Sequence, residues 1–321
     1  MTILVTGGAG YIGAHVVRLL QERGEDVIVV DDLSTGDASR ISGVDLITVD
    51  ISKDEAWRLL TDVMIDKDVQ SVIHFAAKKE VGISVKRPAT YYRQNVGGLA
   101  NLLRAMYDAG VEEMIFSSSA AVYGVPQEDL VTEESEKKPI NPYGHTKLIG
   151  EQMLKDCEVA WGLKSVALRY FNAAGAGWND LADPATLNLI PIALERVRKG
   201  QAPIIFGEDY DTDDGTCVRD YVHVLDLARA HLDALDALRE EKLSHHAYNV
   251  GTGTGSSVKE VLEGLREVSG LNFDIQVGPR REGDPDYLVA DTSRIEEDMG
   301  FEAELGLPEI LQSAWDARSG Q

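Results

Sequence analysis

The sequence predicts an α/β protein built on a doubly wound parallel sheet, and three observations lead to this prediction. Short, continuous apolar runs alternate with helix-like segments through the first half of the chain. Such runs are typical of strands that are buried on both faces, as in parallel sheets. A glycine-rich turn follows the first of these runs directly and opens the first helix. Strand, turn and helix in this order are the repeating unit of a doubly wound sheet.

The expected elements alternate regularly up to Tyr170. Pro88 and Pro142 each stand in the first turn of an expected helix, and Gly110 follows the last turn of one, as these residues prefer. Strands are expected at 2–7, 26–32, 44–50, 69–77, 111–119 and 163–170, and helices at 11–23, 53–65, 88–109 and 142–160.

Beyond Tyr170 the alternation weakens. Residues 172–188 and 207–219 are rich in Gly, Asp and Thr and are expected to form long loops, which often carry function. A helix at 221–235 and strands at 245–251 and 272–277 are expected after them.

Two domains are expected from this organisation. The first comprises residues 1–171, and residues 220–250 return to it. The second is a smaller α/β substrate-binding lobe, made of residues 172–219 and 251–321.

Composition excludes several classes of partner. The 321 residues carry a formal charge of −23, which argues against nucleic acid because nucleic-acid binding needs a basic surface. No segment approaches the ~18 apolar residues of a membrane span, and the N-terminus enters a strand without a basic leader, so we expect a cytoplasmic protein. Cys157 and Cys217 are far apart and no Cys or His spacing suggests a metal site, so free thiols and no metal are expected.

The first glycine turn has the features of a dinucleotide site. In "VTGGAGYIG", Gly7, Gly10 and Gly13 permit a tight turn and let backbone N–H groups approach a pyrophosphate at a helix N-terminus. Asp31 ends the second strand, where a carboxylate accepts bonds from an adenosine ribose and repels a 2′-phosphate. The alternative is an ordinary glycine turn with Asp31 as a strand-end cap. The context favours a Rossmann-type site for NAD rather than NADP.

Three further residues form a candidate proton-transfer set. "NPYGHTK" places Tyr143 and Lys147 four positions apart, on one face of a helix. An ammonium beside a phenol lowers the pKa of the phenol from its usual ~10, which would make the tyrosine an acid or base near neutral pH. Ser119, in "FSSSAAVYG", follows a strand and can share a proton with Tyr143. The alternatives are ordinary helix surface for the pair and a helix cap for the serine.

With these residues in place, the chain resembles the extended short-chain dehydrogenase/reductase superfamily, and within it the UDP-glucose 4-epimerase family. The resemblance runs almost from end to end. The motifs that carry it are "TGGAGYIG", "VIHFAA", "SSSAAVYG", "NPYGHTK", "LRYFNAAGA", "DGTCVRDYVHV", "YNVGTGTGSSV" and "RREGDPDYLVAD".

The resemblance implies a role for each matching position. Tyr143 would be the acid/base, Lys147 its electrostatic partner, and Ser119 a helper of proton transfer. Besides Gly7, Gly10, Gly13, Tyr143 and Lys147, the NAD site would comprise Tyr11, Ile12, Asp31, Asp32, Asp50, Ile51, Phe75, Ala76, Ala77, Lys79, Asn95, Ser117 and Tyr170. The UDP-sugar site would comprise Lys79, Ser119, Tyr143, Phe171, Asn172, Asn188, Leu189, Ile204, Ile205, Phe206, Arg219, Tyr221, Arg281 and Asp284.

The two arginines also make sense on physical grounds. A diphosphate that binds a protein of charge −23 needs fixed cations, and guanidinium groups bind phosphate oxygens in pairs. The alternatives are a structural salt bridge for Arg219, for instance to Asp220, and a solvated loop charge for Arg281.

The reaction implied by the resemblance interconverts UDP-galactose and UDP-glucose through a bound 4-keto sugar, with NAD retained. Among rivals, a 4,6-dehydratase would need an Asp–Glu pair where this chain has Ala120 and Ala121, and elimination without it is improbable. A UDP-glucuronate decarboxylase or epimerase is a second alternative. A redox-silent binding module would have lost the Tyr–Lys pair or the glycines.

Two positions depart from the family pattern. Ile83 replaces the usual glutamate of "VGES", and Leu288 stands where some relatives have a tyrosine that walls the sugar pocket. The smaller Leu288 leaves room for an N-acetyl group, so activity on UDP-GlcNAc and UDP-GalNAc is also expected. The family resemblance further implies a homodimer through helices 88–109 and 142–160.

Overall fold

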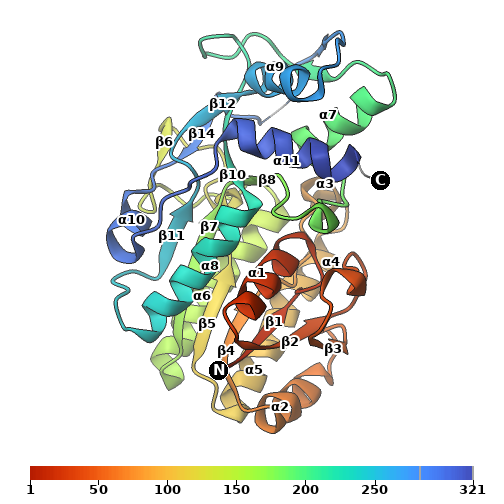
Figure 1. Cartoon of the computed structure of the whole chain (residues 1–321). Helices are drawn as coiled ribbons and strands as arrows, with labels where there is room; N and C mark the ends of the chain where they lie inside the picture. Colours follow the sequence, from red (N-terminus) through yellow and green to blue (C-terminus); the bar gives the residue numbers. More distant parts are fainter. Residues whose placement is uncertain (282, 320–321) are drawn as a thin grey trace.

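A seven-stranded parallel sheet forms the centre of the larger part of the protein in the computed structural model, which describes residues 1–281 and 283–319 (Figure 1). Its strand order is β11-β7-β5-β4-β1-β2-β3. Strands β2 and β3 are added on one side of β1, and β4 and the later strands are added on the other side. The strand order thus reverses between β1 and β4, and a crevice opens between the carboxyl ends of these two strands. This is the predicted α/β fold class. The strands are β1 (Thr2–Thr6), β2 (Asp26–Asp31), β3 (Asp45–Thr48), β4 (Val69–His74), β5 (Glu113–Ser117), β7 (Lys164–Tyr170) and β11 (Ala247–Val250).

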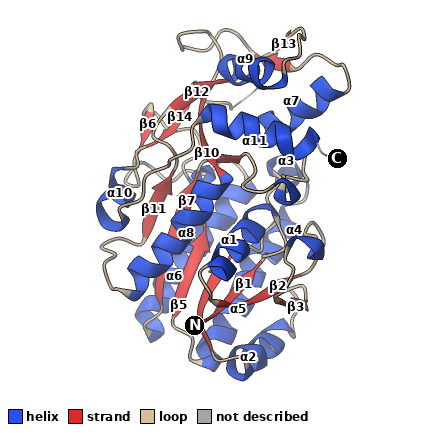
Figure 2. Cartoon of the chain, in the orientation of Figure 1, coloured by secondary structure: helices blue, strands red, loops and turns tan. Residues whose placement is uncertain are grey.

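Helices cover both faces of this sheet (Figure 2). On one face, α1 (Tyr11–Glu22) packs against α8 (Val224–Arg239). On the other face, α5 (Gly98–Ala109) packs against both α2 (Ala56–Asp66) and α6 (Pro142–Trp161).

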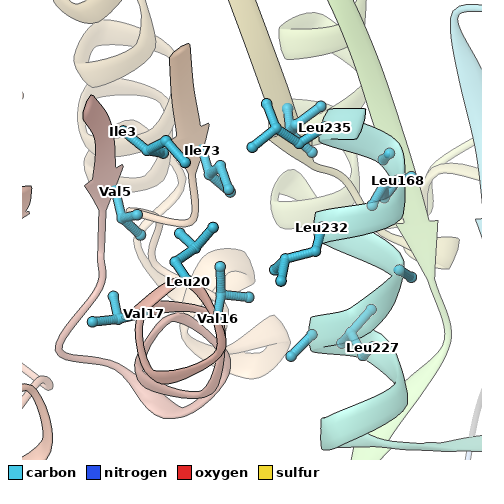
Figure 3. Close-up of a cluster of buried hydrophobic side chains, with 14 of the residues drawn as sticks. Ile3, Val5, Val16, Val17, Leu20, Ile73, Leu168, Leu227, Leu232 and Leu235 are labelled. Atoms are coloured by element: carbon cyan, nitrogen blue, oxygen red, sulfur yellow. The ribbon is translucent and has the colours of Figure 1, made fainter. Parts of the chain in front are cut away.

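Strand β1 shows why the sequence forms this layer structure. Its side chains alternate between faces, and both faces are apolar: Ile3 and Val5 join one buried cluster and Leu4 joins the other, all with no exposed surface. Burying one such side chain contributes roughly 1.5–3 kcal/mol. Figure 3 shows the first cluster, in which side chains of α1 and α8 meet those of β1 and β4; they include Val16, Val17, Leu20, Ile73, Leu227, Leu232 and Leu235.

A second layer of strands lies beyond the carboxyl ends of the first sheet. Strand β10 (Val218–His223) is parallel to β8 (Asn172–Ala174) and β14 (Tyr287–Ala290) and antiparallel to β12 (Gly255–Ser257). Its other elements are β6 (Leu130–Val131), paired with β14, and the pair β9 (Ile204–Phe206) and β13 (Gln276–Gly278). Helices α7 (Leu189–Arg198), α9 (Val258–Ser269) and α11 (Leu307–Ser319) enclose its apolar cluster.

The chain passes between the two sheets several times. Strand β6, from the expected first domain, pairs in the second sheet, and α10 (Ser293–Met299), from the expected lobe, packs on α8 and β11. The division into two domains stays a prediction, and residues 282, 320 and 321 of the expected lobe lie outside the described residues. Among the described helices, none combines the length and apolar character that crossing a bilayer requires.

The expected helix 88–109 is helical throughout but not uniform. It consists of α4 (Pro88–Tyr91), a π-helical stretch (Tyr92–Gly97) and α5. Asn95 lies in the wide turn, where its side chain bonds both backbone groups of Lys78 and also the hydroxyl of Thr146. Widened turns of this kind occur mostly at functional sites, where they redirect a side chain.

Three other expectations need correction. The expected helix 221–235 begins only at Val224, because residues 221–223 pair with β8 and the His223 side chain caps α8 by accepting from the Leu225 N–H. The expected strand 272–277 is limited to β13, which pairs only with the three-residue β9. Helix α7 was not expected, and the loop 172–188 contains β8 and a short 3₁₀ turn (Asn179–Leu181).

Candidate active site

The glycine turn brings β1, α1 and β4 into close contact. Gly7 has φ +71°, and a Cβ on it would lie 2.7 Å from the Ala76 nitrogen. A Cβ on Gly13 would lie 2.3 Å from the Gly7 carbonyl oxygen. Within the described part of the chain no side chain caps α1, and its first turn holds no acid. The first N–H groups of α1 are therefore left without a side-chain partner, and the glycine turn leaves room for a ligand to approach them. A dinucleotide pyrophosphate fits such a helix N-terminus.

Around this turn lies a first cavity of about 410 Å³. Most residues predicted for the cofactor line it: Gly7, Gly10, Tyr11, Ile12, Gly13, Asp31, Asp32, Asp50, Ile51, Phe75, Ala76, Ala77, Lys79, Tyr143, Lys147 and Tyr170. Asn95 and Ser117 do not line it, and they act on its wall through hydrogen bonds.

Other lining residues were missed. Ser34 and Thr35 stand two and three residues after Asp32, so their place just beyond a strand was a usable signal. Residues 183–187 reach the cavity from a distant loop, and no local pattern announces them. The remaining additions are Val30, Val49, Lys78, Glu80 and Gln94.

Asp31 fixes the glycine turn to the end of β2. Its Oδ2 accepts from the Ala9 N–H at 3.0 Å and its Oδ1 from the Leu33 N–H at 2.9 Å. Burial raises the pKa of Asp31, although these two bonds oppose the shift. The carboxylate thus serves as the strand-end cap considered above, and each oxygen keeps a lone pair that a ribose hydroxyl can use.

Tyr143 and Lys147 project from the first two turns of α6 into the wall of the first cavity. Asn141 caps the helix by accepting from the Gly144 N–H at 2.9 Å. A Cβ on Gly144 would lie 2.4 Å from the Ala121 carbonyl oxygen, so the helix start lies directly against the turn that follows Ser119. The Lys147 ammonium donates to the Ser117 carbonyl at 2.6 Å. The hydroxyls of Ser117 and Tyr170 share a bond of 2.7 Å.

The electrostatics of this pair differ from the expectation. Burial raises the pKa of Tyr143, Tyr170 adds to the increase, and a hydrogen bond with Ser119 lowers it. Burial also lowers the pKa of Lys147 to about 7, opposed by Glu151. The pKa of Tyr143 thus lies above its usual value because loss of solvent outweighs the local interactions, and its lowering by Lys147 and a bound nicotinamide stays a prediction.

A second cavity, also of about 410 Å³, lies in the second layer. It is lined by most residues predicted for the UDP-sugar: Asn172, Asn188, Leu189, Ile204, Ile205, Phe206, Arg219, Tyr221, Arg281 and Asp284. Lys79 and Tyr143 line the first cavity, whereas Ser119 and Phe171 line neither. Leu187 lines both cavities, so the two adjoin. The lining residues that were missed are Ile192, Arg196, Gly207, Cys217 and Val258.

The two predicted arginines are held differently. Arg219 donates to the carbonyls of Val218 and Pro285 at 2.7 and 2.9 Å and pairs with Asp284 at 3.3 Å. Arg219 therefore does form the salt bridge considered as the alternative, but with Asp284; Asp220 is fully buried and accepts instead from Thr252, Gly253 and Ala290. The Arg281 guanidinium stacks 4.1 Å from the centre of the Phe206 ring. Arg281 is exposed and lies in a loop, so the alternative of a solvated loop charge stays open, although its guanidinium contacts an aromatic ring.

Comparison with known proteins agrees with this geometry. The sequence pattern of the NAD dependent epimerase/dehydratase family matches residues 3–251. The chain belongs to this family. Curated members similar to it include UDP-glucose 4-epimerases of Halalkalibacterium halodurans, 45% identical over 98% of this chain and 95% of that one, and of Azospirillum brasilense, 47% identical over 93% and 86%.

Solved structures of family members superpose closely. The UDP-glucose-4-epimerase of Stenotrophomonas maltophila, with bound NAD and formylated UDP-arabinopyranose, has a TM-score of 0.94 and 38% identity over 100% of this chain and 98% of that one. The UDP-glucose 4-epimerase of Brucella ovis, in complex with NAD, has a TM-score of 0.92 and 43% identity over 98% and 97%. The resemblance found in the sequence is thus confirmed.

The lowered pKa of Lys147 predicts a pH dependence of stability. Unfolded lysine has a pKa of about 10.4, so between about pH 7 and pH 10 the unfolded chain binds a proton that the folded chain lacks. The free energy of unfolding therefore contains a term that rises with pH there, by up to about 1.4 kcal/mol per unit. Lys147→Met should lack this rise when urea unfolding of both proteins is compared across the range. If the free energies of unfolding of the two proteins change with pH in the same way, Lys147 does not have the lowered pKa.

Proposed function

We propose that this family member is an NAD-dependent epimerase that inverts carbon 4 of a UDP-hexose and interconverts UDP-galactose and UDP-glucose. The observation that carries the proposal is the buried Tyr143–Lys147 pair in the wall of a cavity formed by a glycine turn, beside a second cavity with two fixed arginines. Curated relatives at 45% and 47% identity carry the name of this activity.

The residues of the first cavity suit NAD. The N-terminus of α1 and the glycine turn would hold its pyrophosphate, and Asp31 would accept bonds from its adenosine ribose and repel a 2′-phosphate. Lys147 would bond the second ribose. When bound, NAD supplies a reversible hydride acceptor next to carbon 4, so that the hexose passes through a 4-keto form.

Proton transfer is assigned to the residues around Tyr143. As a phenolate, Tyr143 would take the proton of the 4-hydroxyl, and the resulting phenol would later return a proton to the oxygen on carbon 4, with Ser119 sharing the hydrogen bond. Because burial raises the pKa of Tyr143, its phenolate needs a nearby positive charge, and Lys147 is the cation that the chain places one helical turn away. Tyr170, bonded to Ser117, would keep the phenol's surroundings ordered.

The second cavity would hold the nucleotide part of the substrate. Arg219 and Arg281 would bind the diphosphate and Asn172 and Asn188 the sugar-phosphate region, while Ile204, Ile205 and Phe206 would pack on uracil. Firm binding of UDP leaves the hexose as the only part that needs to turn over between the two half-reactions.

The first experiment uses the purified protein with UDP-galactose and no added NAD. Formation of UDP-glucose, followed by chromatography, is the expected result, because NAD should remain bound through turnover. Tyr143→Phe should lower the rate by about 10²–10⁴-fold through loss of the proton-transfer group. The variant should still bind UDP. If UDP-galactose gives a dehydrated product, or gives none while UDP-glucuronate is decarboxylated or epimerised, another nucleotide-sugar activity takes the place of this proposal.

The arginine assignment has a matched control within the chain. Arg281→Ala should weaken UDP binding by at least about tenfold, measured by calorimetry, because a charged hydrogen bond to phosphate is lost. The neighbouring Arg280 pairs with Asp286 and stacks on Tyr210, and among the described residues it is not part of the second cavity's lining. Arg280→Ala should leave UDP affinity within about twofold. Equal losses in both variants would place the diphosphate elsewhere.

Leu288 favours activity on a second pair of substrates, UDP-GlcNAc and UDP-GalNAc. Leu288 on β14 packs against the cluster that contains Phe171, and we expect that the tyrosine some relatives have there would leave less room for the sugar. A structural neighbour, the UDP-Glc/GlcNAc 4-epimerase of Campylobacter jejuni, has 38% identity and a TM-score of 0.87. We expect conversion of UDP-GlcNAc to UDP-GalNAc in the same chromatographic assay. Turnover confined to the unacetylated pair would rule this out.

Two further features belong to the proposal. We expect a homodimer through the helical stretch 88–109 and α6, whose outer faces expose Tyr92, Tyr107, Ile149 and Val159; sedimentation at a monomer mass would contradict it. We also expect a cytoplasmic location, consistent with Cys157 and Cys217 as free thiols.

A further inference from the structure

A buried ion pair lies one helical turn beyond Lys147. Glu151 and Arg169 are only 6% and 4% exposed. Arg169 Nε donates to Glu151 Oε1 at 2.9 Å, and a terminal nitrogen of Arg169 donates to Oε2 at 2.6 Å. The Ser118 hydroxyl also donates to Oε1, at 2.6 Å. Planar two-point pairing of this kind fixes direction as well as distance.

The ion pair connects segments that carry the residues of the proposed proton-transfer site. Glu151 shares helix α6 with Tyr143 and Lys147. Ser118 lies between Ser119 and Ser117, whose carbonyl accepts from the Lys147 ammonium. The pair therefore joins α6 to the end of β5 just behind the site.

Arg169 joins a third segment to the same point. It directly precedes Tyr170 on β7. Its other terminal nitrogen donates to the Tyr123 hydroxyl at 3.0 Å and to the Glu133 carbonyl at 3.2 Å. Tyr123 ends the short turn that Ser119 begins, so the orientation of Ser119 also depends on the arginine.

We propose that Glu151 and Arg169 form a positioning pair for the reaction, which sets the relative placement of Lys147, Ser119 and Tyr170 and keeps the Lys147 ammonium charged. The inference rests on the proposed function and adds two residues that do not touch substrate. Lys147 has lost its solvent, and the Glu151 carboxylate four residues later on the same helix opposes the resulting loss of its charge.

The other groups around Lys147 make this carboxylate decisive. The ring of Phe116 lies 5.0 Å from the ammonium, and His74 on β4 has its pKa lowered to about 3 by burial and by Lys147. His74 is thus neutral, and the phenols are weak acids whose pKa burial raises. Among the described residues, the titratable groups that act on Lys147 are His74 from β4 and Glu151 from α6. Arg169 on β7 pairs with Glu151, and Tyr170 bonds the hydroxyl of Ser117, whose carbonyl accepts from Lys147.

The test uses Glu151→Gln, which keeps the shape and one acceptor but removes the charge. We expect kcat for UDP-galactose to fall by at least about tenfold with KM changed less than about twofold, since the substrate is not contacted. The alkaline limb of the kcat–pH profile should move to lower pH, because Lys147 loses its proton earlier. Glu151→Asp, which keeps the charge, should restore the wild-type pH limb even where kcat stays reduced.

A control variant separates positioning from simple stability. Asp226 is a fully buried carboxylate on α8 that pairs with Arg229 at 3.0 Å. Asp226→Asn should lower the free energy of unfolding but leave the pH limb in place. If Glu151→Gln behaves in the same way, with reduced stability and an unchanged pH limb, the pair is only structural and the proposal is overturned.

A stability measurement tests this proposal even if the proposed epimerase function is wrong, because it needs no catalysis. Urea unfolding of Glu151→Gln, with and without Lys147→Met, gives the pH window in which Lys147 contributes to stability. In the Glu151→Gln background this window should extend to lower pH than in the wild-type background. An identical window in both backgrounds would overturn the proposal, whether or not the protein turns over UDP-galactose. If Glu151→Gln does not fold, Arg169→Lys is tested instead. We expect kcat to fall in this variant, and we expect the Glu151 carboxylate to keep its effect on the pKa of Lys147.

Discussion

The placement of the site depends on one hydrogen bond, from the Lys147 ammonium to the Ser117 carbonyl at 2.6 Å. An ammonium in the protein interior is costly, and a strong bond to a fixed carbonyl offsets part of that cost. The bond also ties α6 to the end of β5. As a result Tyr143, one turn earlier on the helix, reaches the cavity wall rather than the helix surface. The Glu151–Arg169 pair reinforces the same connection from behind, at the next turn.

The close contacts of glycine explain how the first cavity comes to lie against this helix. Gly7 and Gly13 bring β1 and the start of α1 against each other and against the segment after β4, leaving no space for a side chain. Gly144 does the same between α6 and the turn that follows Ser119. Residues at or just after the carboxyl ends of β1, β2, β4 and β7 therefore line one cavity, and Lys147 connects it to the end of β5.

The sequence predicted what depends on local pattern. Continuous apolar runs located the seven-stranded sheet, and residues at or just after the ends of its strands, such as Asp31 and Phe75, line the first cavity. Features set by tertiary contacts were missed. The π-helical turn at Asn95 exists because its amide bonds Lys78 and Thr146, and the strand at 221–223 exists because β8 pairs with it. The pKa of Tyr143 depends on burial, which no sequence spacing measures.

The net negative charge of the chain and the arginines of the second cavity affect a bound anion in different ways. Charges on the surface of a chain of net charge −23 are screened by water and salt, so they repel a diphosphate weakly at distances beyond ~10 Å. Within the cavity, Arg219 is anchored to two carbonyls, so its guanidinium need not be ordered when a ligand arrives, whereas Arg281 is exposed and contacts the Phe206 ring. Asp284 neutralises part of the Arg219 charge, and a bound diphosphate would compete with it for the same nitrogen. If the second cavity holds the diphosphate as proposed, the placement of Arg219 matters more for that binding than the net charge of the chain does.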